Sequence, residues 1–466
     1  MSRPIYLTQD IRRIEQAAGN ATPPLMERAG TAAASLAMSL AGDKGKDVLI
    51  LAGPGNNGGD AKIVFKALKE KFFRVVLATK PREIPQDVRW SLVVDGLFGN
   101  GLARPIDGEF ATLVDFANAQ SCPVLALDIP SGLESDSGRV LGRAVRATHT
   151  ITFIGLKPGL LTLDGPDHCG QITVADLSIE SIPAAASRGW VAEPALFSSV
   201  LKPRPKEFHK GMAGSVGIIG GDEGMAGAAL LAGRAALKMG TGRVYAGMLE
   251  ELAVDTGAPE LMLRRPEDVL GLELDAIVVG PGLGQGERAE TLLGAALASE
   301  LPCVLDADAL NLIAANENLR KACARRKADT LLTPHPAEAG RLLAETTAHV
   351  QTDRLKAARA LASNLKAHVV LKGNGSVLVA RDGHWFINTS GNAGMGSAGM
   401  GDVLSGILGA LLAQKYSGET ALVLGTHLHG CAADACVKGG AGPVGLAAGE
   451  LIEPARRVWN SWLAQT

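Results

Sequence analysis

The stretch NAGMGSAGMGDVLSGILGAL, from Asn392 to Leu411, joins a glycine-rich loop to an apolar segment. In that segment, apolar side chains recur at the spacing of a helix, at Val403, Leu404, Ile407, Leu408 and Leu411. Glycines let the main chain approach an anion closely, and the amides at a helix N-terminus favour a phosphate there. Phosphate loops usually close with Lys and Ser or Thr, whereas this one closes with Asp402. A carboxylate in that position would repel phosphates, so it must have another task.

The chain around this stretch alternates short apolar strands with helices, in two blocks. Near-continuous apolar runs of this kind are typical of parallel strands that are covered on both faces. The first block has such runs at residues 47–53, 74–79, 92–99, 123–130 and 148–155. The second block has them at residues 215–221, 276–284, 302–310, 330–338 and 368–380. The pattern predicts two three-layer α/β/α domains with right-handed crossovers.

A segment rich in Pro, Ala and Ser, without periodicity, lies between the blocks at residues 181–211. We place the domain boundary near Pro194 to Lys206, which gives domains of residues 1–195 and 205–466. In such sheets, ligands bind at the carboxyl ends of the strands, where most of the Gly-rich motifs of this chain fall.

The composition limits the classes of partner. The chain has 46 Lys plus Arg against 48 Asp plus Glu, a balance that favours a small metabolite over nucleic acid or an anionic membrane. The first residues are charged where a signal peptide would be apolar, and no apolar run is long enough to span a bilayer, so we expect a cytoplasmic protein. The six cysteines are scattered and are interpreted as reduced core thiols.

In the first block, the motif LAGPGNNGGDAKIVFKAL predicts a strand that ends at Ala52, a tight turn, and a helix that begins near Asp60. This turn suits a pyrophosphate, although it lacks both the GxGxxG pattern and the Lys-Ser/Thr pair of a Walker loop. A turn of this kind can be purely structural. The side chains of Asn56, Asn57 and Asp60 favour a binding site, because they add oxygen ligands that a bare turn does not need.

Two further strands of this block end in acids. Asp95 is followed by Gly99, Gly101 and Arg104, and Asp128 is followed by Ser131. Either acid alone could be a helix cap or a turn former, but together with the asparagine turn they predict a site. Oxygen ligands without Cys or His favour a hard cation, so the set Asn57, Asp95 and Ser131 could share a monovalent ion or Mg²⁺. Asp128 then remains for proton transfer.

In the second block, HPAE places His335 and Glu338 at a strand end, although a lone His is more often structural. DADALNLI places Asp306 and Asp308 before a helix, where the simplest interpretation is an N-cap. KGNGS, residues 372–376, joins two β-runs as a hairpin turn, and its Lys is also a candidate phosphate contact.

The motifs GPGNNGGD, DIPSGL, GPGLG, DADALN, TPHPAE, KGNGS and NAGMGSAGMGDVLSG, in this order, resemble those of the bifunctional NAD(P)H-hydrate repair enzymes. The resemblance spans nearly the whole chain. It implies a Rossmann-like epimerase domain followed by a ribokinase-like dehydratase domain that depends on ADP or ATP.

The resemblance also implies site residues. In the first domain, the residues that match substrate contacts are Asn56, Asn57, Gly58, Gly59, Asp60, Gly99, Asn100, Gly101, Leu102, Ala103, Arg104, Pro105 and Asp128, with Asp128 as the acid/base. The residues that match potassium ligands are Asn57, Asp95 and Ser131. In the second domain, the hydrate contacts match Ala228, Gly284, His335 and Asp402, and the nucleotide contacts match Lys372, Gly373, Asn374, Gly375, Ser376 and Gly401.

The implied chemistry gives Asp402 its task, which is to take the proton of the C6 hydroxyl on the hydrated nicotinamide ring. The implied small molecules are hydrated NADH and NADPH, ADP or ATP with Mg²⁺, and K⁺ in the epimerase domain, and a homo-oligomer is expected. Two alternatives remain. The chain could be a ribokinase-type small-molecule kinase, or its first domain could be a non-catalytic binding or assembly module.

Overall fold

The computed structural model describes residues 2–43, 46–179 and 187–464. Contacts divide the chain after Trp190 into an N-terminal unit, residues 3–190, and a C-terminal unit that begins at Val191. The first six residues of the aperiodic segment, 181–186, lie outside the described residues. The domain limits 1–195 and 205–466 stay a prediction.

The N-terminal unit is built on a parallel sheet of order β3-β2-β4-β5-β6-β7. Its strands are β2 (Asp47–Ala52), β3 (Arg74–Ala78), β4 (Leu92–Gly96), β5 (Val124–Leu127), β6 (His149–Phe153) and β7 (Gln171–Ala175). The predicted apolar runs of the first block therefore form strands, as expected. A short antiparallel pair of β1 (Pro4–Ile5) with β8 (Gly189–Val191) completes the strands of this part of the chain, with Pro4 opposite Trp190.

Helices cover both faces of this sheet. One core cluster joins Val48 and Ile50 to α1 (Thr8–Ala17), α2 (Leu25–Ala41) and α3 (Asn56–Glu70). The other joins Leu49 and Leu51 to α4 (Gly108–Asn118). Successive side chains of β2 thus enter opposite cores, which is why the strand is apolar throughout. The remaining helix of the unit is α5 (Gly165–Cys169).

The start of α3 differs from the prediction. It begins at Asn56, four residues before the expected Asp60, so Gly58 and Gly59 lie inside its first turn. A Cβ at Gly58 would lie 1.9 Å from the carbonyl oxygen of Gly53, and a Cβ at Gly53 would lie 1.7 Å from that of Leu97. These glycines allow a close approach of backbones, which the sequence pattern alone could not distinguish from a loop.

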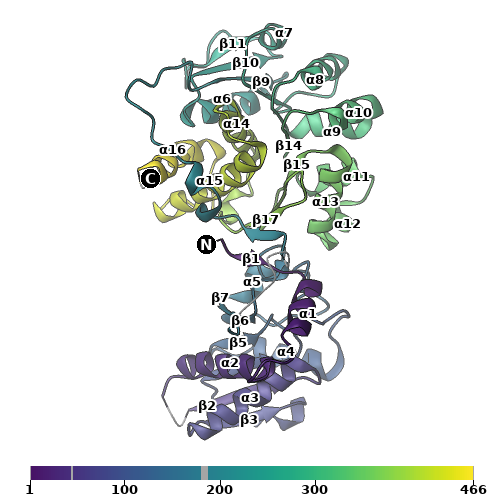
Figure 1. The fold of residues 1–466 in the computed structure, drawn as a ribbon, viewed down its shortest axis with the longest axis vertical. Coiled ribbons are helices and arrows are strands. Elements are labelled where there is room, and N and C mark those ends of the chain that lie inside the picture. The colour runs from purple at the N-terminus through teal and green to yellow at the C-terminus, as the bar shows by residue number, and fades with distance from the viewer. Residues whose placement is uncertain (1, 44–45, 180–186, 465–466) are drawn as a thin grey trace. The chain divides into compact units, whose positions relative to one another are not determined.

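The C-terminal unit has a sheet with strands in the order β17-β16-β15-β14-β13-β12-β9-β10-β11. Figure 1 labels β9, β10, β11, β14, β15 and β17 of this sheet. The strands from β15 to β11 are parallel, and β15, β16 and β17 form antiparallel hairpins. Their bounds are β9 (Ser215–Gly220), β10 (Arg243–Met248), β11 (Met262–Arg264), β12 (Ala276–Val279), β13 (Cys303–Leu305), β14 (Thr330–Leu332), β15 (His368–Leu371), β16 (Ser376–Val379) and β17 (Trp385–Asn388).

The opening stretch forms α14 (Met400–Ala413), which packs against α6 (Ala226–Lys238) and α15 (Gly418–Lys438) on one side of the sheet (Figure 1). A Cβ at Gly406 would lie 2.1 Å from the carbonyl oxygen of Ala232, so this glycine brings the backbones of α14 and α6 together. Almost all of α14 is buried, and only Gly401 and Asp402 in its first turn are partly exposed. The other helices of the unit are α7 (Pro266–Leu270), α8 (Glu287–Ala298), α9 (Ala307–Ala315), α10 (Glu317–Arg325), α11 (Pro336–Leu343), α12 (Thr347–Thr352), α13 (Arg354–Leu365) and α16 (Ile452–Leu463).

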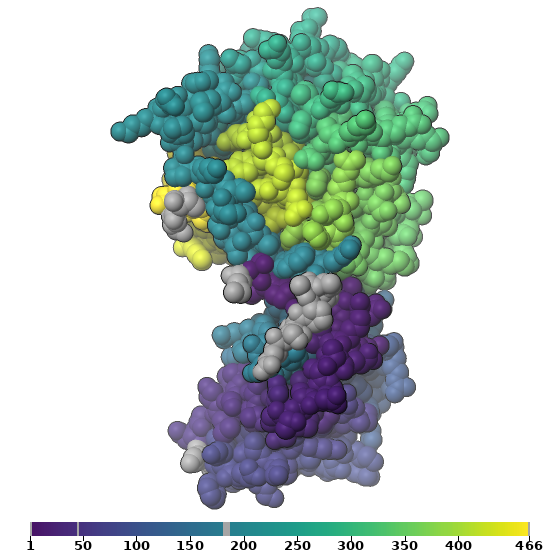
Figure 2. Space-filling model, in the orientation of Figure 1, coloured from purple at the N-terminus to yellow at the C-terminus, as the bar shows by residue number. Residues whose placement is uncertain are grey.

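The start of the C-terminal unit packs on its last helices. Phe197 is 1% exposed, and its ring lies 5.4 Å from that of Trp462 in α16. The teal segment after residue 200 continues over the surface beside the yellow C-terminal helices (Figure 2), where the Arg204 guanidinium donates to Gln414 Oε1. Among the described residues, no helix is long and apolar enough to cross a membrane.

Candidate active sites

A cavity of about 560 Å³ opens in the N-terminal unit at the carboxyl ends of β2, β4 and β5. It brings together most of the substrate contacts predicted there, namely Asn56, Asn57, Asp60, Gly99, Asn100, Gly101, Leu102, Ala103, Arg104 and Asp128. The predicted residues Gly58, Gly59 and Pro105 are not part of its lining. Side chains from α1, Ile11, Arg12 and Glu15, close the cavity and were not predicted.

Asp128 is held by a lysine that sequence reasoning missed. Its φ angle is 66°, in the left-handed region, which an Asp tolerates better than most residues. Its Oδ1 lies 2.5 Å from the Nζ of Lys157, a side chain with no exposed surface. Lys157 Nζ also donates to Thr152 Oγ1 at 2.7 Å and to the Phe153 carbonyl at 2.9 Å. A single charge in the apolar run IGLKPGL was the signal that could have indicated it.

Asp60 and Glu15 add acidity to this cavity. Burial, with help from the Asp128 and Glu15 carboxylates, raises the pKa of Asp60 to about 8, so it carries a proton at neutral pH. Its Oδ1 is buried and has no hydrogen-bond partner among the described residues. Burial and Asp128 also raise the pKa of Glu15. The cavity can therefore offer a ligand both a proton donor and carboxylate acceptors.

The predicted ion ligands lie beside the cavity. Asp95 has no exposed surface, and it accepts hydrogen bonds from Ser131 Oγ at 2.6 Å and from Ser131 N at 2.8 Å. Burial raises the pKa of Asp95 to about 6. The amide of Asn57 is buried, and neither its oxygen nor its nitrogen has a hydrogen-bond partner within the described part of the chain. An unsatisfied oxygen of this kind is what a bound cation would use.

In the C-terminal unit, Asp402 lies in the first turn of α14, behind Gly399, whose φ angle is +89°. Burial and the nearby Asp306 carboxylate raise the pKa of Asp402 to about 7, although the Lys372 ammonium by itself lowers this pKa. A carboxyl with this pKa can take a proton near neutral pH, which fits the predicted role of a general base.

Asp306 stands at the N-cap position of α9, as its sequence context indicates, but its side chain does not cap the helix. Its side chain makes no capping hydrogen bond and is 1% exposed, with Oδ1 2.9 Å from Lys372 Nζ and Oδ2 accepting from Ser405 Oγ at 2.7 Å. Burial raises its pKa, but the Lys372 ammonium and these hydrogen bonds outweigh burial and hold it below the usual range. The Asp308 carboxylate instead holds the loop that follows β12, because it accepts a hydrogen bond from the Gly284 amide at 3.0 Å. Sequence alone could not show that Lys372 lies close enough to pair.

His335 has a structural role in the described chain. It precedes α11, and its Nδ1 accepts from the amides of Ala337 at 3.1 Å and Glu338 at 3.3 Å, while Glu338 Oε2 accepts from the His335 amide at 2.7 Å. Burial and the Lys372 charge lower the pKa of His335, so its ring is neutral at neutral pH. This reciprocal cap fixes the ring at the carboxyl end of β14, where it can also contact a ligand.

The predicted nucleotide turn, residues 372–376, joins β15 to β16 and is held by a buried arginine. The buried guanidinium of Arg354 donates to the carbonyls of Asn374 at 2.5 Å and Leu371 at 3.1 Å. A Cβ at Gly401 would lie 3.0 Å from Lys372 Nζ, so the turn's lysine reaches the start of α14. The structure thus brings Lys372, Gly401 and Asp402 together.

Two further placements complete the site. Ala228 lies in the first turn of α6, and a Cβ at Gly282 would lie 3.3 Å from its Cβ, so it borders the loop that carries Gly284.

Asp434, in α15, was not predicted. Its carboxylate accepts from the Gly391 amide at 2.9 Å and from Asn392 Nδ2 at 3.0 Å, which anchors the start of the glycine-rich loop.

The comparisons with known proteins agree with both units. The family described as NAD(P)H-hydrate dehydratase matches residues 216–453, and that described as YjeF-related protein N-terminus matches residues 23–92 and 86–159. The chain is 38% identical to the bifunctional NAD(P)H-hydrate repair enzyme Nnr of Escherichia coli (strain K12), over 98% of this chain and 94% of that one. It is 36% identical to the bifunctional NAD(P)H-hydrate repair enzyme of Leishmania braziliensis, over 92% and 88% respectively.

Solved structures resemble the C-terminal part. The ADP/ATP-dependent NAD(P)H-hydrate dehydratase from Bacillus subtilis, co-crystallized with ATP/Mg²⁺, is 28% identical with a TM-score of 0.51, over 58% of this chain and 98% of that one. A ribokinase-like superfamily protein from Enterococcus faecalis shares the fold, with a TM-score of 0.51 at 23% identity, over 59% and 96%. With its two units, its family matches and its full-length relatives, the chain belongs to the family of bifunctional NAD(P)H-hydrate repair enzymes.

Proposed function

We propose that this chain repairs hydrated NADH and NADPH. The N-terminal unit interconverts the R and S hydrates, and the C-terminal unit dehydrates the S hydrate in a reaction that consumes ADP or ATP. The observation that carries the proposal is Asp402, a carboxyl with a pKa of about 7 at the N-terminus of a buried helix, beside Lys372. The names of the full-length relatives support both activities.

Dehydration begins with proton transfer. Asp402, deprotonated, accepts the proton of the C6 hydroxyl as that oxygen attacks the terminal phosphoryl group of the nucleotide. The free amides at the start of α14 and the Lys372 ammonium stabilise the negative charge that grows on this group. The bond to the leaving phosphate of the nucleotide breaks, which leaves the hydrate phosphorylated on C6.

Elimination then restores the cofactor. The electron pair of the ring nitrogen expels phosphate from C6, since phosphate is a far better leaving group than hydroxide. Loss of a proton from the neighbouring ring carbon regenerates the double bond of NADH or NADPH. The products are the reduced cofactor, free phosphate and the shortened nucleotide, so a dehydratase differs from a kinase in releasing no stable phosphorylated substrate.

Mg²⁺ fits the dehydratase site because its acidic side chains offer hard oxygen ligands and Mg²⁺ is usually shared with nucleotide phosphates. Glu338 is the side chain that would hold it. This carboxylate is 4% exposed and lies 3.9 Å from Lys372 Nζ, at the edge where the nucleotide turn meets α14. The ion would offset phosphate charge.

In the N-terminal unit, Asp128 exchanges a proton with the hydrate while Lys157 fixes its carboxylate. Asp60, protonated at neutral pH, donates a hydrogen bond to the ligand through its otherwise unsatisfied carboxyl group. Asn57, Asp95 and Ser131 would hold K⁺, for which the unsatisfied oxygen of Asn57 and a set of oxygen donors with a single acid are suited. The ion would position ligand phosphates or ribose.

A truncated chain that starts at Val191 tests the division of labour, because it keeps Phe197 packed on Trp462. With a mixture of R and S hydrates and nucleotide, it should consume the S hydrate and leave the R hydrate, whereas the full chain should consume both. Consumption of both epimers by the truncated chain at the rate of the full chain would refute the epimerase assignment.

The homo-oligomer and the cytoplasmic location stay predictions. Light scattering on the purified full chain measures the oligomeric state. Rates of dehydration with ADP and with ATP determine which nucleotide the chain uses.

A further inference from the structure

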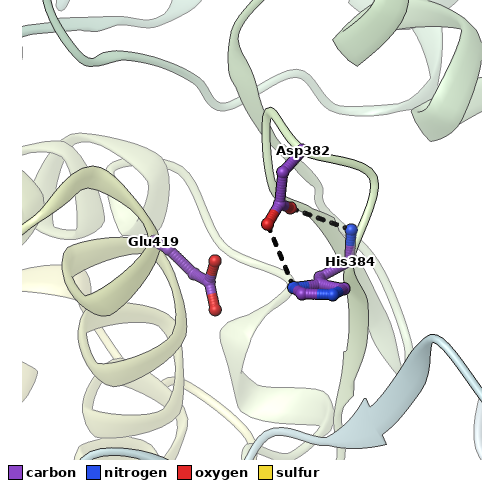
Figure 3. A group of neighbouring side chains, drawn as sticks. All are labelled: Asp382, His384 and Glu419. Carbon is purple, nitrogen blue, oxygen red and sulfur yellow. Dashed lines mark hydrogen bonds and ion pairs between the residues drawn. The ribbon is translucent and has the colours of Figure 1, made fainter. Parts of the chain in front are cut away.

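Outside both active sites, three side chains that can bind a metal converge in the C-terminal unit. Asp382 and His384 lie on the turn between β16 and β17, and Glu419 lies in the first turn of α15. One ligand atom from each lies within 4.8 Å of the other two. In Figure 3 the Glu419 carboxylate points toward the imidazole of His384, and the Asp382 carboxylate contacts the ring nitrogen on the side that faces Glu419.

The turn holds Asp382 and His384 in a fixed relation. Asp382 Oδ1 accepts from the His384 amide at 3.0 Å, and Oδ2 lies 3.1 Å from His384 Nδ1. The turn itself is closed by the Ala380 amide, which donates to the His384 carbonyl at 2.7 Å. Nδ1 and a carboxylate oxygen are therefore already placed side by side, at a separation that a single metal ion can bridge.

Glu419 supplies negative charge to this cluster. Its carboxylate is half-buried, and within the described ranges no lysine or arginine forms an ion pair with it. Arg381, which is adjacent to Asp382 in the sequence, could have paired with Glu419. Its guanidinium instead donates to the carbonyls of Lys327 and Arg326. Burial and the Asp382 carboxylate raise the pKa of Glu419, and His384 and His368 lower it by less, so the net shift is upward.

We propose that Asp382, His384 and Glu419 bind one divalent transition-metal ion of the zinc class, through Nδ1 of the histidine and one oxygen of each carboxylate. A nitrogen ligand favours such an ion over Mg²⁺ or Ca²⁺, which prefer oxygen alone. Ligands about 2.0–2.2 Å from a tetrahedral zinc ion stand roughly 3.4 Å apart. The Asp382 and His384 atoms, at 3.1 Å, are already near that spacing, whereas the Glu419 carboxylate, within 4.8 Å of them, must come closer. The long side chain of Glu419 closes that gap, and water completes the coordination.

The ion would fasten the β16–β17 turn to the start of α15. That helix also carries Asp434, which anchors Gly391 and Asn392 at the start of the glycine-rich loop. The site is distinct from the catalytic groups, so its expected effect is on stability. An ion that binds only the folded chain raises the melting temperature, and the rise grows with the logarithm of the ion concentration divided by its Kd.

The test uses the full chain, freed of metal with a chelator and dialysed. Zn²⁺ binding is measured by calorimetry, and Co²⁺ is used as a spectroscopic probe of tetrahedral coordination. Glu419→Gln and His384→Gln should each weaken Zn²⁺ binding at least about tenfold and abolish the rise in melting temperature. His349→Gln is the matched control, because His349 Nε2 lies 3.9 Å from Glu345 without forming part of a three-ligand group in the described chain.

Dehydration by each variant should equal that of the wild type and shows that the variants are folded. The proposal is overturned if the wild type binds no Zn²⁺ at a one-to-one ratio. It is also overturned if Glu419→Gln and His384→Gln bind Zn²⁺ as tightly as His349→Gln does.

Discussion

Lys372 Nζ and Asp306 Oδ1 lie 2.9 Å apart directly below the first turn of α14. Both residues lie at the carboxyl ends of strands of the same sheet. Lys372 follows β15 and Asp306 follows β13, and β14 lies between these two strands. Burial lowers the pKa of Lys372, but the Asp306 and Glu338 carboxylates outweigh burial, so the net shift is upward and the ammonium stays charged. The pair thus fixes a positive charge at the start of α14, next to Asp402, the proposed base.

Replacing the base should stop the chemistry and leave binding. In Asp402→Asn the amide has nearly the same shape but cannot accept the proton, so nucleotide-dependent dehydration should fall by about 10² to 10⁴. Affinity for the S hydrate, measured by calorimetry, should change little. Dehydration within a few-fold of the wild type would exclude Asp402 as the base.

The acid limb of the pH profile should report the same group. Because Asp402 acts deprotonated and its pKa is about 7, the dehydration rate should rise with pH through that value and then level off. Asp306→Asn removes a negative charge that raises this pKa, so the limb should move to lower pH. Ser405→Ala keeps the charge and removes only a hydrogen bond to Asp306, so it is the control and should leave the limb in place. A limb unmoved in Asp306→Asn would contradict the electrostatic account.

The sequence predicted the strands well because their composition is set by burial on both faces. β2, for example, sends side chains into two cores and reads as a continuous apolar run. The glycine-rich loop before α14 was also predicted, since helical spacing and glycines give separate signals. The start of α3 was not, because glycines that allow close packing inside a helix look like those of a loop.

Groups that act through pairing were the ones missed. Lys157 and Asp128 are far apart in sequence, and Lys157 has no motif of its own, so only the tertiary fold brings them together. Asp306 has the sequence context of an N-cap, yet its carboxylate is buried and forms an ion pair with Lys372 instead of capping the helix. Such pairings depend on which strand ends become neighbours, and local sequence does not encode that order.

Lys157→Met should damage the N-terminal unit in two ways. It leaves the Asp128 carboxylate buried without its partner, so we expect a loss of about 3–5 kcal/mol in the free energy of unfolding, measured with urea. Epimerisation should also fall, while dehydration of the S hydrate continues. Lys62→Met, at an exposed position of α3, should change stability by no more than about 0.5 kcal/mol. Epimerisation at the wild-type rate in folded Lys157→Met would remove Lys157 from the site.

Potassium dependence should be confined to epimerisation. Asp95→Asn weakens the proposed ion site, so R-to-S conversion should slow while dehydration is spared. Replacing K⁺ with a bulky organic cation should slow the wild type in the same way, since such a cation cannot enter the oxygen set of Asn57, Asp95 and Ser131. Epimerisation that is indifferent to both changes would rule the ion site out.

The most direct test of the central claim follows one oxygen atom. The S hydrate is prepared with heavy oxygen in its C6 hydroxyl and is incubated with the full chain and nucleotide. If Asp402 directs phosphoryl transfer to that hydroxyl, the label should leave the ring in the released phosphate, and Asp402→Asn should release almost none. Label that appears in water, with unlabelled phosphate, would contradict phosphorylation of the hydroxyl, and a stable labelled phosphorylated hydrate would indicate a kinase instead.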